Sequence, residues 1–163
     1  MKNIIKTAII AIALTTVALT ANAQSKGDMA AGAKIAFGTG TGYSNLGIGA
    51  KFQYNVTDPL RLEAGFTYFL PKNNVNMWDF SVNAHWLFPV SEGINLYPMA
   101  GLGMWGTRAS YMGYSAGVSE VAFNLGGGAD FKLSDSMFFN AEAKYLVSGG
   151  GLLVLSAGLG FMF

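Results

Sequence analysis

Residues 45–56 read Asn-Leu-Gly-Ile-Gly-Ala-Lys-Phe-Gln-Tyr-Asn-Val. Every second residue from Leu46 to Tyr54 is apolar, and the residues between them are glycine or polar. A period of two places alternate side chains on opposite faces of a β-strand. This stretch therefore predicts a strand with one apolar and one polar face, and Asp58-Pro59 supplies the turn chemistry that follows it.

The same alternation recurs along the chain, which predicts seven more strands. They are expected at residues 29–38, 60–70, 77–88, 94–106, 120–133, 137–147 and 152–163. Pro98 cannot donate a ladder hydrogen bond, so we expect a β-bulge there. Residues 107–119 are predicted to form the longest loop. Strands of about ten residues can cross a bilayer when they are tilted, and the even strand number leaves both termini on one side.

The N-terminus has the features of a secretory signal peptide at residues 1–23. Lys2 and Lys6 are basic, residues 9–19 are mostly apolar, and Ala21-Asn22-Ala23 has the small-x-small pattern of a cleavage site. We expect residues 24–163 to be the folded domain. After residue 24 no apolar run approaches the length of a transmembrane helix, so the predicted class is an all-β, eight-stranded antiparallel up-and-down transmembrane barrel.

Composition supports a membrane environment and excludes several kinds of chemistry. Charged residues are 12% of the chain, about half the usual soluble share of roughly 25%. The chain has no cysteine, which excludes disulfides, thiolate metal sites and a cysteine nucleophile. A net charge of +1 argues against a nucleic-acid partner.

The polar face is predicted to line the barrel interior, because it is rich in glycine, asparagine and serine and its charges nearly cancel. Its charged or titratable members are Lys34, Lys51, Arg61, Glu63, Asp79, His85, Asp130, Lys132, Glu142 and Lys144. The apolar face carries aromatic side chains near both strand ends, as membrane barrels do. They are Tyr68, Trp78 and Tyr145 at one end, and Tyr54, Trp86, Phe88, Phe131 and Phe161 at the other.

Two details of the interior can be predicted. A turn centred near Thr57 would place Lys51 opposite Glu63, and we expect these two side chains to form an ion pair. Tyr97, Met99 and Trp105 also fall on the interior face, where they either line a ligand pocket or fill space. Filling is favoured because eight strands leave an interior only wide enough for side chains.

Two glycine motifs match known patterns without the context that those patterns need. Residues 113–117 match G-x-S-x-G, but no strand-to-helix turn follows, and His85 is expected near the opposite end of the barrel. Residues 101–106 match G-x-G-x-x-G without a following helix. His85 is the only histidine, and Ser81 lies about 13 Å along the same strand, so neither a catalytic dyad nor a metal site is expected.

These features resemble the small bacterial outer-membrane barrels of the OmpA/OmpX type, often described as porin-family or outer-membrane β-barrel domains. The resemblance covers residues 24–163 and includes the terminal segment 159–163, Leu-Gly-Phe-Met-Phe. It implies outer-membrane lipid as the surroundings and recognition of Phe161 and Phe163 by the assembly machinery. It also implies outer loops near 39–42, 71–76, 107–119 and 148–151; three of these are shorter than in many relatives.

The resemblance indicates architecture more than activity. We expect a non-catalytic protein without a cofactor or metal, which supports envelope integrity or contacts an unidentified extracellular partner through residues 107–119. That segment carries side chains that often anchor contacts, namely Arg108, Tyr111, Met112 and Tyr114. A narrow channel for small solutes or ions is the alternative, and a lipid-modifying enzyme is a third possibility.

Overall fold

The computed structural model describes residues 25–40, 43–72, 74–111 and 114–163. The predicted signal peptide lies outside the described residues. The strands are β1 (Met29–Gly40), β2 (Tyr43–Asn55), β3 (Leu60–Lys72), β4 (Val75–Trp86), β5 (Phe88–Ser91), β6 (Ile94–Tyr111), β7 (Tyr114–Lys132), β8 (Met137–Val147) and β9 (Leu152–Met162). No helix in the described part of the chain is long and apolar enough to cross a membrane.

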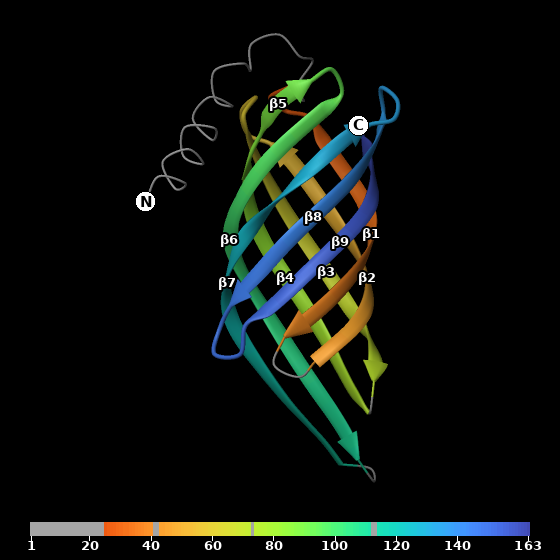
Figure 1. Ribbon diagram of the computed structural model, residues 1–163, viewed down its shortest axis with the longest axis vertical. Helices are drawn as coiled ribbons and strands as arrows, with labels where there is room; N and C mark the ends of the chain where they lie inside the picture. The colour runs from red at the N-terminus through yellow and green to blue at the C-terminus, as the bar shows by residue number, and fades with distance from the viewer. Residues whose placement is uncertain (1–24, 41–42, 73, 112–113) are drawn as a thin grey trace, which may run out of the picture.

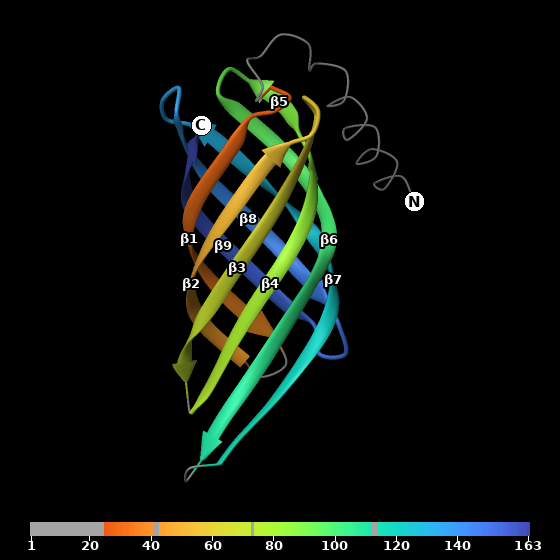
Figure 2. The same ribbon diagram turned by 180° about the vertical axis from the view of Figure 1, so that it is seen from behind.

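The strands form one closed antiparallel barrel (Figures 1 and 2). The sheet order is β4-β3-β2-β1-β9-β8-β7-β6-β5, and pairing of β4 with β6 closes it. The eight predicted strands are therefore confirmed, with β5 as a short addition. The start of β1 and the C-terminus lie at the same end of the barrel as β5 (Figure 1).

The predicted bulge at Pro98 is wrong, and the interruption lies in the neighbouring strand instead. Pro98 pairs with Gly127 of β7 without a register shift. On the other side, β4 stops pairing after His85 opposite Met99, and β5 resumes with Phe88 opposite Leu96. Pro98 falls in this gap, where neither β4 nor β5 pairs with it. Proline has no N–H to donate, so the gap avoids a ladder hydrogen bond that could not form.

The segment 107–119 is not the predicted loop. Pairing of β6 with β7 continues to Tyr111 opposite Tyr114, so both strands run on as a hairpin that projects beyond the other strands (Figures 1 and 2). The hairpin pairs backbone groups, which glycine, serine and tyrosine can all do without period-two hydrophobicity. The longest predicted loop is thus a two-stranded ribbon.

Alternation places polar side chains inside the barrel and large apolar ones outside. In β3, for example, Arg61, Glu63 and Thr67 are fully buried, whereas Leu62 is 42% and Phe66 46% exposed. The outer face is apolar over most of the barrel, which is the reverse of a water-soluble protein. A chain folded this way needs hydrocarbon, not water, around it.

Candidate functional site: the polar interior of the barrel

Arg61 of β3 lies at the centre of the first cluster in the interior. Its guanidinium contacts the Asp130 carboxylate of β7 at 2.6 Å. Its Nε also donates to Nδ1 of His85 at 3.3 Å, and its carbon Cζ lies 4.8 Å from the centre of the Tyr97 ring. His85 is brought there because it faces Arg61 directly across the β3–β4 ladder. The charge of Arg61 is therefore balanced by Asp130 and shielded by two rings.

Tyr97 of β6 extends this cluster across the barrel. Its ring stacks on His85 with centroids 4.4 Å apart and planes 7° apart. Its hydroxyl donates to Glu142 at 3.0 Å and accepts from Asn140 at 2.6 Å. A Cβ on Gly128 would lie 2.5 Å from the Tyr97 hydroxyl, so glycine is what lets the ring lie there. Tyr97 thus fills and connects the interior and does not line an open pocket.

The expected pairing of Lys51 with Glu63 is present, although the predicted register is wrong. Gln53 lies opposite Glu63, and Lys51 lies opposite Gly65. The β2–β3 turn is therefore shifted from the predicted centre, yet Lys51 Nζ reaches Glu63 diagonally at 3.4 Å and Glu142 at 3.8 Å. It also donates a hydrogen bond to Asn140. Two carboxylates around one ammonium make a network whose members depend on one another.

A second cluster lies farther toward the projecting hairpin. Lys144 of β8 contacts Asp79 of β4 at 2.7 Å and donates to Ser81 at 3.0 Å. Asn124 of β7 donates to Asn83 at 2.8 Å. Because Ser81 accepts a hydrogen bond from Lys144, and His85 accepts one from Arg61 and stacks on Tyr97, the two residues do not form a hydroxyl–imidazole pair.

Nine of the ten predicted interior residues are buried inside the barrel. Lys132 is the exception, since its side chain is 40% exposed and pairs with Asp135 at 2.8 Å. It is the last residue of β7, at the end of the barrel, where its side chain reaches water. A hydrogen bond from Lys132 and its positive charge lower the pKa of Asp135. Among the described residues, the buried charges then balance as four cations and four carboxylates, namely Lys34, Lys51, Arg61 and Lys144 with Glu63, Asp79, Asp130 and Glu142.

Glu63, His85 and Glu142 come together although they lie on three strands, and no sequence pattern indicated this. Each offers a ligand atom, and these atoms lie within 4.8 Å of one another. The chemistry does not suit a metal ion, because Lys51 already contacts both carboxylates and Arg61 donates to His85 Nδ1. A nitrogen that accepts a hydrogen bond leaves the proton of the neutral ring on the other nitrogen, Nε2. The trio is therefore part of the balanced network.

Apolar side chains occupy interior positions nearer the hairpin end, and sequence reasoning missed them. They form one cluster with Trp105 packed against it: Ala36, Phe69, Met77, Ala122, Leu146, Leu152 and Val154. A smaller cluster holds Leu87 together with Tyr97 and Met99, the latter two of which were predicted on the interior face. Phe69 and Met77 continue the interior face of β3 and β4, so strand parity was the available signal, but their apolar character hid it.

The remaining predicted residues lie away from the interior. Arg108 is exposed on β6, and Met112 lies outside the described residues. Tyr111 and Tyr114 pair with each other at the end of the hairpin. The two glycine motifs fall on strands: residues 101–106 are within β6, and the described part of 113–117 is within β7. Phe161 and Phe163, which are 54% and 69% exposed, lie on the outer face near the C-terminus.

Comparison with known proteins identifies the architecture. Residues 8–163 match the model of the outer membrane protein beta-barrel domain. The chain belongs to this family. It is therefore a bacterial outer-membrane protein, and its exposed apolar face contacts membrane lipid. Among curated proteins, no sequence matches the chain.

Solved structures of the same architecture are similar in fold but distant in sequence. The N-terminal β-barrel domain of Pseudomonas aeruginosa OprF has a TM-score of 0.70 at 18% identity, covering 86% of this chain and 100% of that one. Ail, the attachment invasion locus protein of Yersinia pestis, has 0.64 at 19% identity, with 85% and 99% coverage. OprG of Pseudomonas aeruginosa has 0.64 at 12% identity, with 88% and 99% coverage. Such identities establish a shared fold and leave the activity open.

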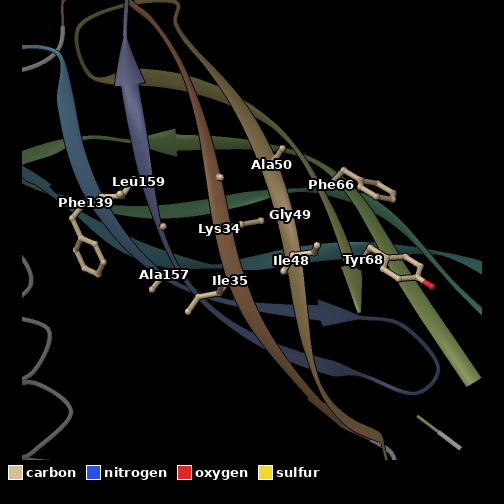
Figure 3. Close-up of a pocket in the computed structure, with 12 residues that line it drawn as sticks. Lys34, Ile35, Ile48, Gly49, Ala50, Phe66, Tyr68, Phe139, Ala157 and Leu159 are labelled. Carbon is tan, nitrogen blue, oxygen red and sulfur yellow. The ribbon is translucent and has the colours of Figure 1, made fainter. Parts of the chain in front are cut away.

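A shallow groove of about 770 Å³ lies on the outer face of this family member. Small side chains on β1, β2 and β9 form its floor, and larger ones, including Phe66, Tyr68 and Phe139, border it (Figure 3). Ala33 faces Ala50 across the β1–β2 ladder, which explains why the surface is hollow there. Within the barrel wall this groove faces hydrocarbon, so we assign it to lipid contact.

Proposed function

We propose that this outer-membrane barrel is non-catalytic and contacts a partner outside the cell through the β6–β7 hairpin. The observation that carries the proposal is the unpaired edge of β7. Pairing of β7 with β8 ends at Phe123 opposite Val147, whereas β7 begins at Tyr114. Within the described part of the chain, residues 114–122 are thus paired only with β6. At the other edge of the hairpin, β4 pairs with β6 as far as Ala109.

A free edge presents backbone N–H and C=O groups that another extended chain can pair with. Nine residues of strand span about 30 Å, long enough for several ladder bonds. Residues 116–121 are all exposed, and Val118 and Val121 are 64% and 67% exposed. Arg108 and Glu120 add one charge of each sign. The edge therefore favours an extended, partly apolar peptide segment as the partner.

One structural neighbour supports a surface role of this kind. Ail, the attachment invasion locus protein, has been solved with the heparin analogue sucrose octasulfate. The barrel of this chain is filled by ion pairs and apolar clusters, which supports a sealed wall that preserves the envelope. We also propose that Phe161 and Phe163 mark the last strand for the assembly machinery, because both are exposed and aromatic.

Removal of residues 110–117 tests the proposal. The refolded protein in lipid vesicles is applied to cultured host cells, with a heat-dependent gel shift as the folding control. We expect the deletion to abolish cell binding and to leave the barrel folded. Equal binding by the deletion variant and the parent would refute the surface role.

Adjacent proline substitutions test the edge itself. Successive N–H groups of a strand point to opposite sides, so one of Val118→Pro and Ser119→Pro removes a donor from the free edge and the other disturbs pairing with β6. We expect the variant at the free edge to lose binding while the hairpin stays formed. If only the variant that disturbs pairing with β6 loses binding, the partner contacts side chains of the hairpin and not the backbone of its free edge.

A further inference from the structure

Several polar atoms of the interior have no hydrogen-bond partner among the described residues, and they are not scattered. Seven of the eight lie on β2, β3 or β4: Gln53 Oε1, Asn55 Nδ2, Glu63 Oε1, Thr67 Oγ1, Asp79 Oδ1, Asn83 Nδ2 and His85 Nε2; the eighth is Asn124 Oδ1 on β7. The residues that bear them are all at most 2% exposed. Buried polar atoms are costly without a partner, so a group of them along one wall calls for an explanation.

The ladder registers place these residues at successive levels of the wall. Asn55, Arg61 and His85 share the level nearest the β2–β3 turn. Gln53, Glu63 and Asn83 follow, and Thr67 lies opposite Asp79 two levels farther on. The unpartnered atoms therefore line a path along the barrel axis.

Gly65 occupies the level between Glu63 and Thr67, and three polar atoms converge beside it. The position that a Cβ would take there is 3.6 Å from both Lys34 Nζ and Ser81 Oγ, and 3.7 Å from Glu63 Oε1. These are ordinary van der Waals distances, so the three polar atoms surround this position without crowding it. A buried water needs two to four polar partners, and the three atoms that converge beside Gly65 can supply them.

The path meets an apolar barrier at the next level. Phe69 lies opposite Met77, and both side chains are buried in the apolar cluster with Leu146, Leu152 and Val154. Water does not wet a narrow apolar constriction, which is how hydrophobic gates close channels. The polar path and the barrier are thus adjacent parts of one interior.

We propose that the β2–β4 wall holds a file of ordered water that conducts protons up to Phe69 and Met77, and that these two side chains are its gate. This inference does not depend on the surface role of the hairpin. Protons pass from one water to the next along hydrogen bonds, so the file needs no pore wide enough for a hydrated ion. In the closed state shown here, the protein is expected not to conduct protons.

Proton flux into vesicles tests the gate. Refolded protein is placed in liposomes that contain a pH-sensitive dye, and a pH jump is applied. We expect Phe69→Ser to raise the flux by about tenfold over the parent protein, which corresponds to a barrier lowered by about 1.4 kcal/mol. The matched control is Phe66→Ser, three residues away on the lipid face and 46% exposed, which should leave the flux unchanged. Equal flux through the two variants would overturn the gate.

Thr67→Val tests the water file independently of whether Phe69→Ser folds. Valine has the shape of threonine without the hydroxyl. If water bonds to Thr67 Oγ1, the substitution removes a hydrogen bond and lowers the unfolding midpoint. If the hydroxyl is dry and unpartnered, the substitution removes a buried polar group and raises the midpoint. A raised midpoint would overturn the proposal, whereas a lowered one, with slower flux in the Phe69→Ser background, would support it.

Discussion

The ion pair between Lys144 and Asp79 offers the sharpest test of how the barrel interior contributes to stability. The two charged atoms are 2.7 Å apart, and the side chains are 2% and 0% exposed. At an effective dielectric constant of about 20, unit charges at this separation attract by about 6 kcal/mol. Desolvation of both groups offsets much of this, but removal of one partner leaves the other buried and uncompensated, at a cost of about 3–5 kcal/mol.

We therefore expect Asp79→Asn and Lys144→Met each to lower the free energy of unfolding by about 3–5 kcal/mol. The double variant should lose much less than the sum, with a coupling energy of about 2–4 kcal/mol. Urea unfolding of the protein in lipid vesicles, followed by tryptophan fluorescence, measures all four states of this cycle.

The chain contains a matched exposed pair as the control. Lys132 and Asp135 are 2.8 Å apart, nearly the same distance, but Lys132 is 40% exposed and Asp135 fully so. Solvent screening and side-chain entropy reduce such pairs to little. We expect no measurable coupling between Lys132→Met and Asp135→Asn. If the coupling energy of the buried Lys144–Asp79 pair is no larger than that of the exposed Lys132–Asp135 pair, the reasoning is refuted, because burial would then not determine how strongly an ion pair contributes to stability.

Two further substitutions test packing and export. Gly128→Ala would place a Cβ 2.5 Å from the Tyr97 hydroxyl, so we expect a loss of about 1–3 kcal/mol in unfolding free energy. Gly149→Ala, with no atom within 4 Å, is its control, and equal midpoints for the two would contradict the assigned close contact. Phe163→Ala should reduce the amount of protein in the outer membrane of cells without slowing refolding in detergent. The lipid-facing Phe131→Ala should not, and similar losses would argue against a special role of the terminal residue.

Most of the barrel was predictable from the sequence because lipid contact imposes a strict rule on every strand that crosses the membrane. Outward residues must be apolar, so the alternation seen in residues 45–56 recurs in each strand. The same parity placed Arg61 and Glu63 inside the barrel. The same parity could also have placed Phe69 inside. Its neighbours in the sequence, Tyr68 and Leu70, are hydrophobic too, so the alternation between polar and apolar residues is lost at this point.

The hairpin was missed because the rule no longer applies beyond the barrel. Among the described residues, the part of β7 before Phe123 has no neighbour on its second edge, and residues 116–121 are exposed on both faces. Alternation is then not needed, and the Gly-Ser-Tyr composition of the segment suggested a loop. What holds it as a ribbon is backbone pairing with β6, which sequence periodicity does not report.

The partners of the interior charges could not be predicted because they depend on the register of several strands at once. A shift of two residues in the β2–β3 hairpin separates the predicted from the observed neighbour of Glu63. The ion pair with Lys51 survives this shift because a lysine side chain is long enough to reach diagonally. Strand faces are thus a property of local sequence, whereas the network is a property of the closed barrel.

The interior network also explains how a narrow hairpin can project from the membrane in a fixed direction. Both of its strands are hydrogen-bonded near the point where pairing with β8 ends: Trp105 of β6 donates to Ser148 at 3.2 Å, and Asn124 of β7 donates to Asn83 at 2.8 Å. The surroundings of these bonds are less polar than water, which strengthens them. The base of the hairpin is therefore held while the edge at 114–122 stays open. A free strand that is already extended loses little entropy on pairing, so these hydrogen bonds favour binding at a surface they do not touch.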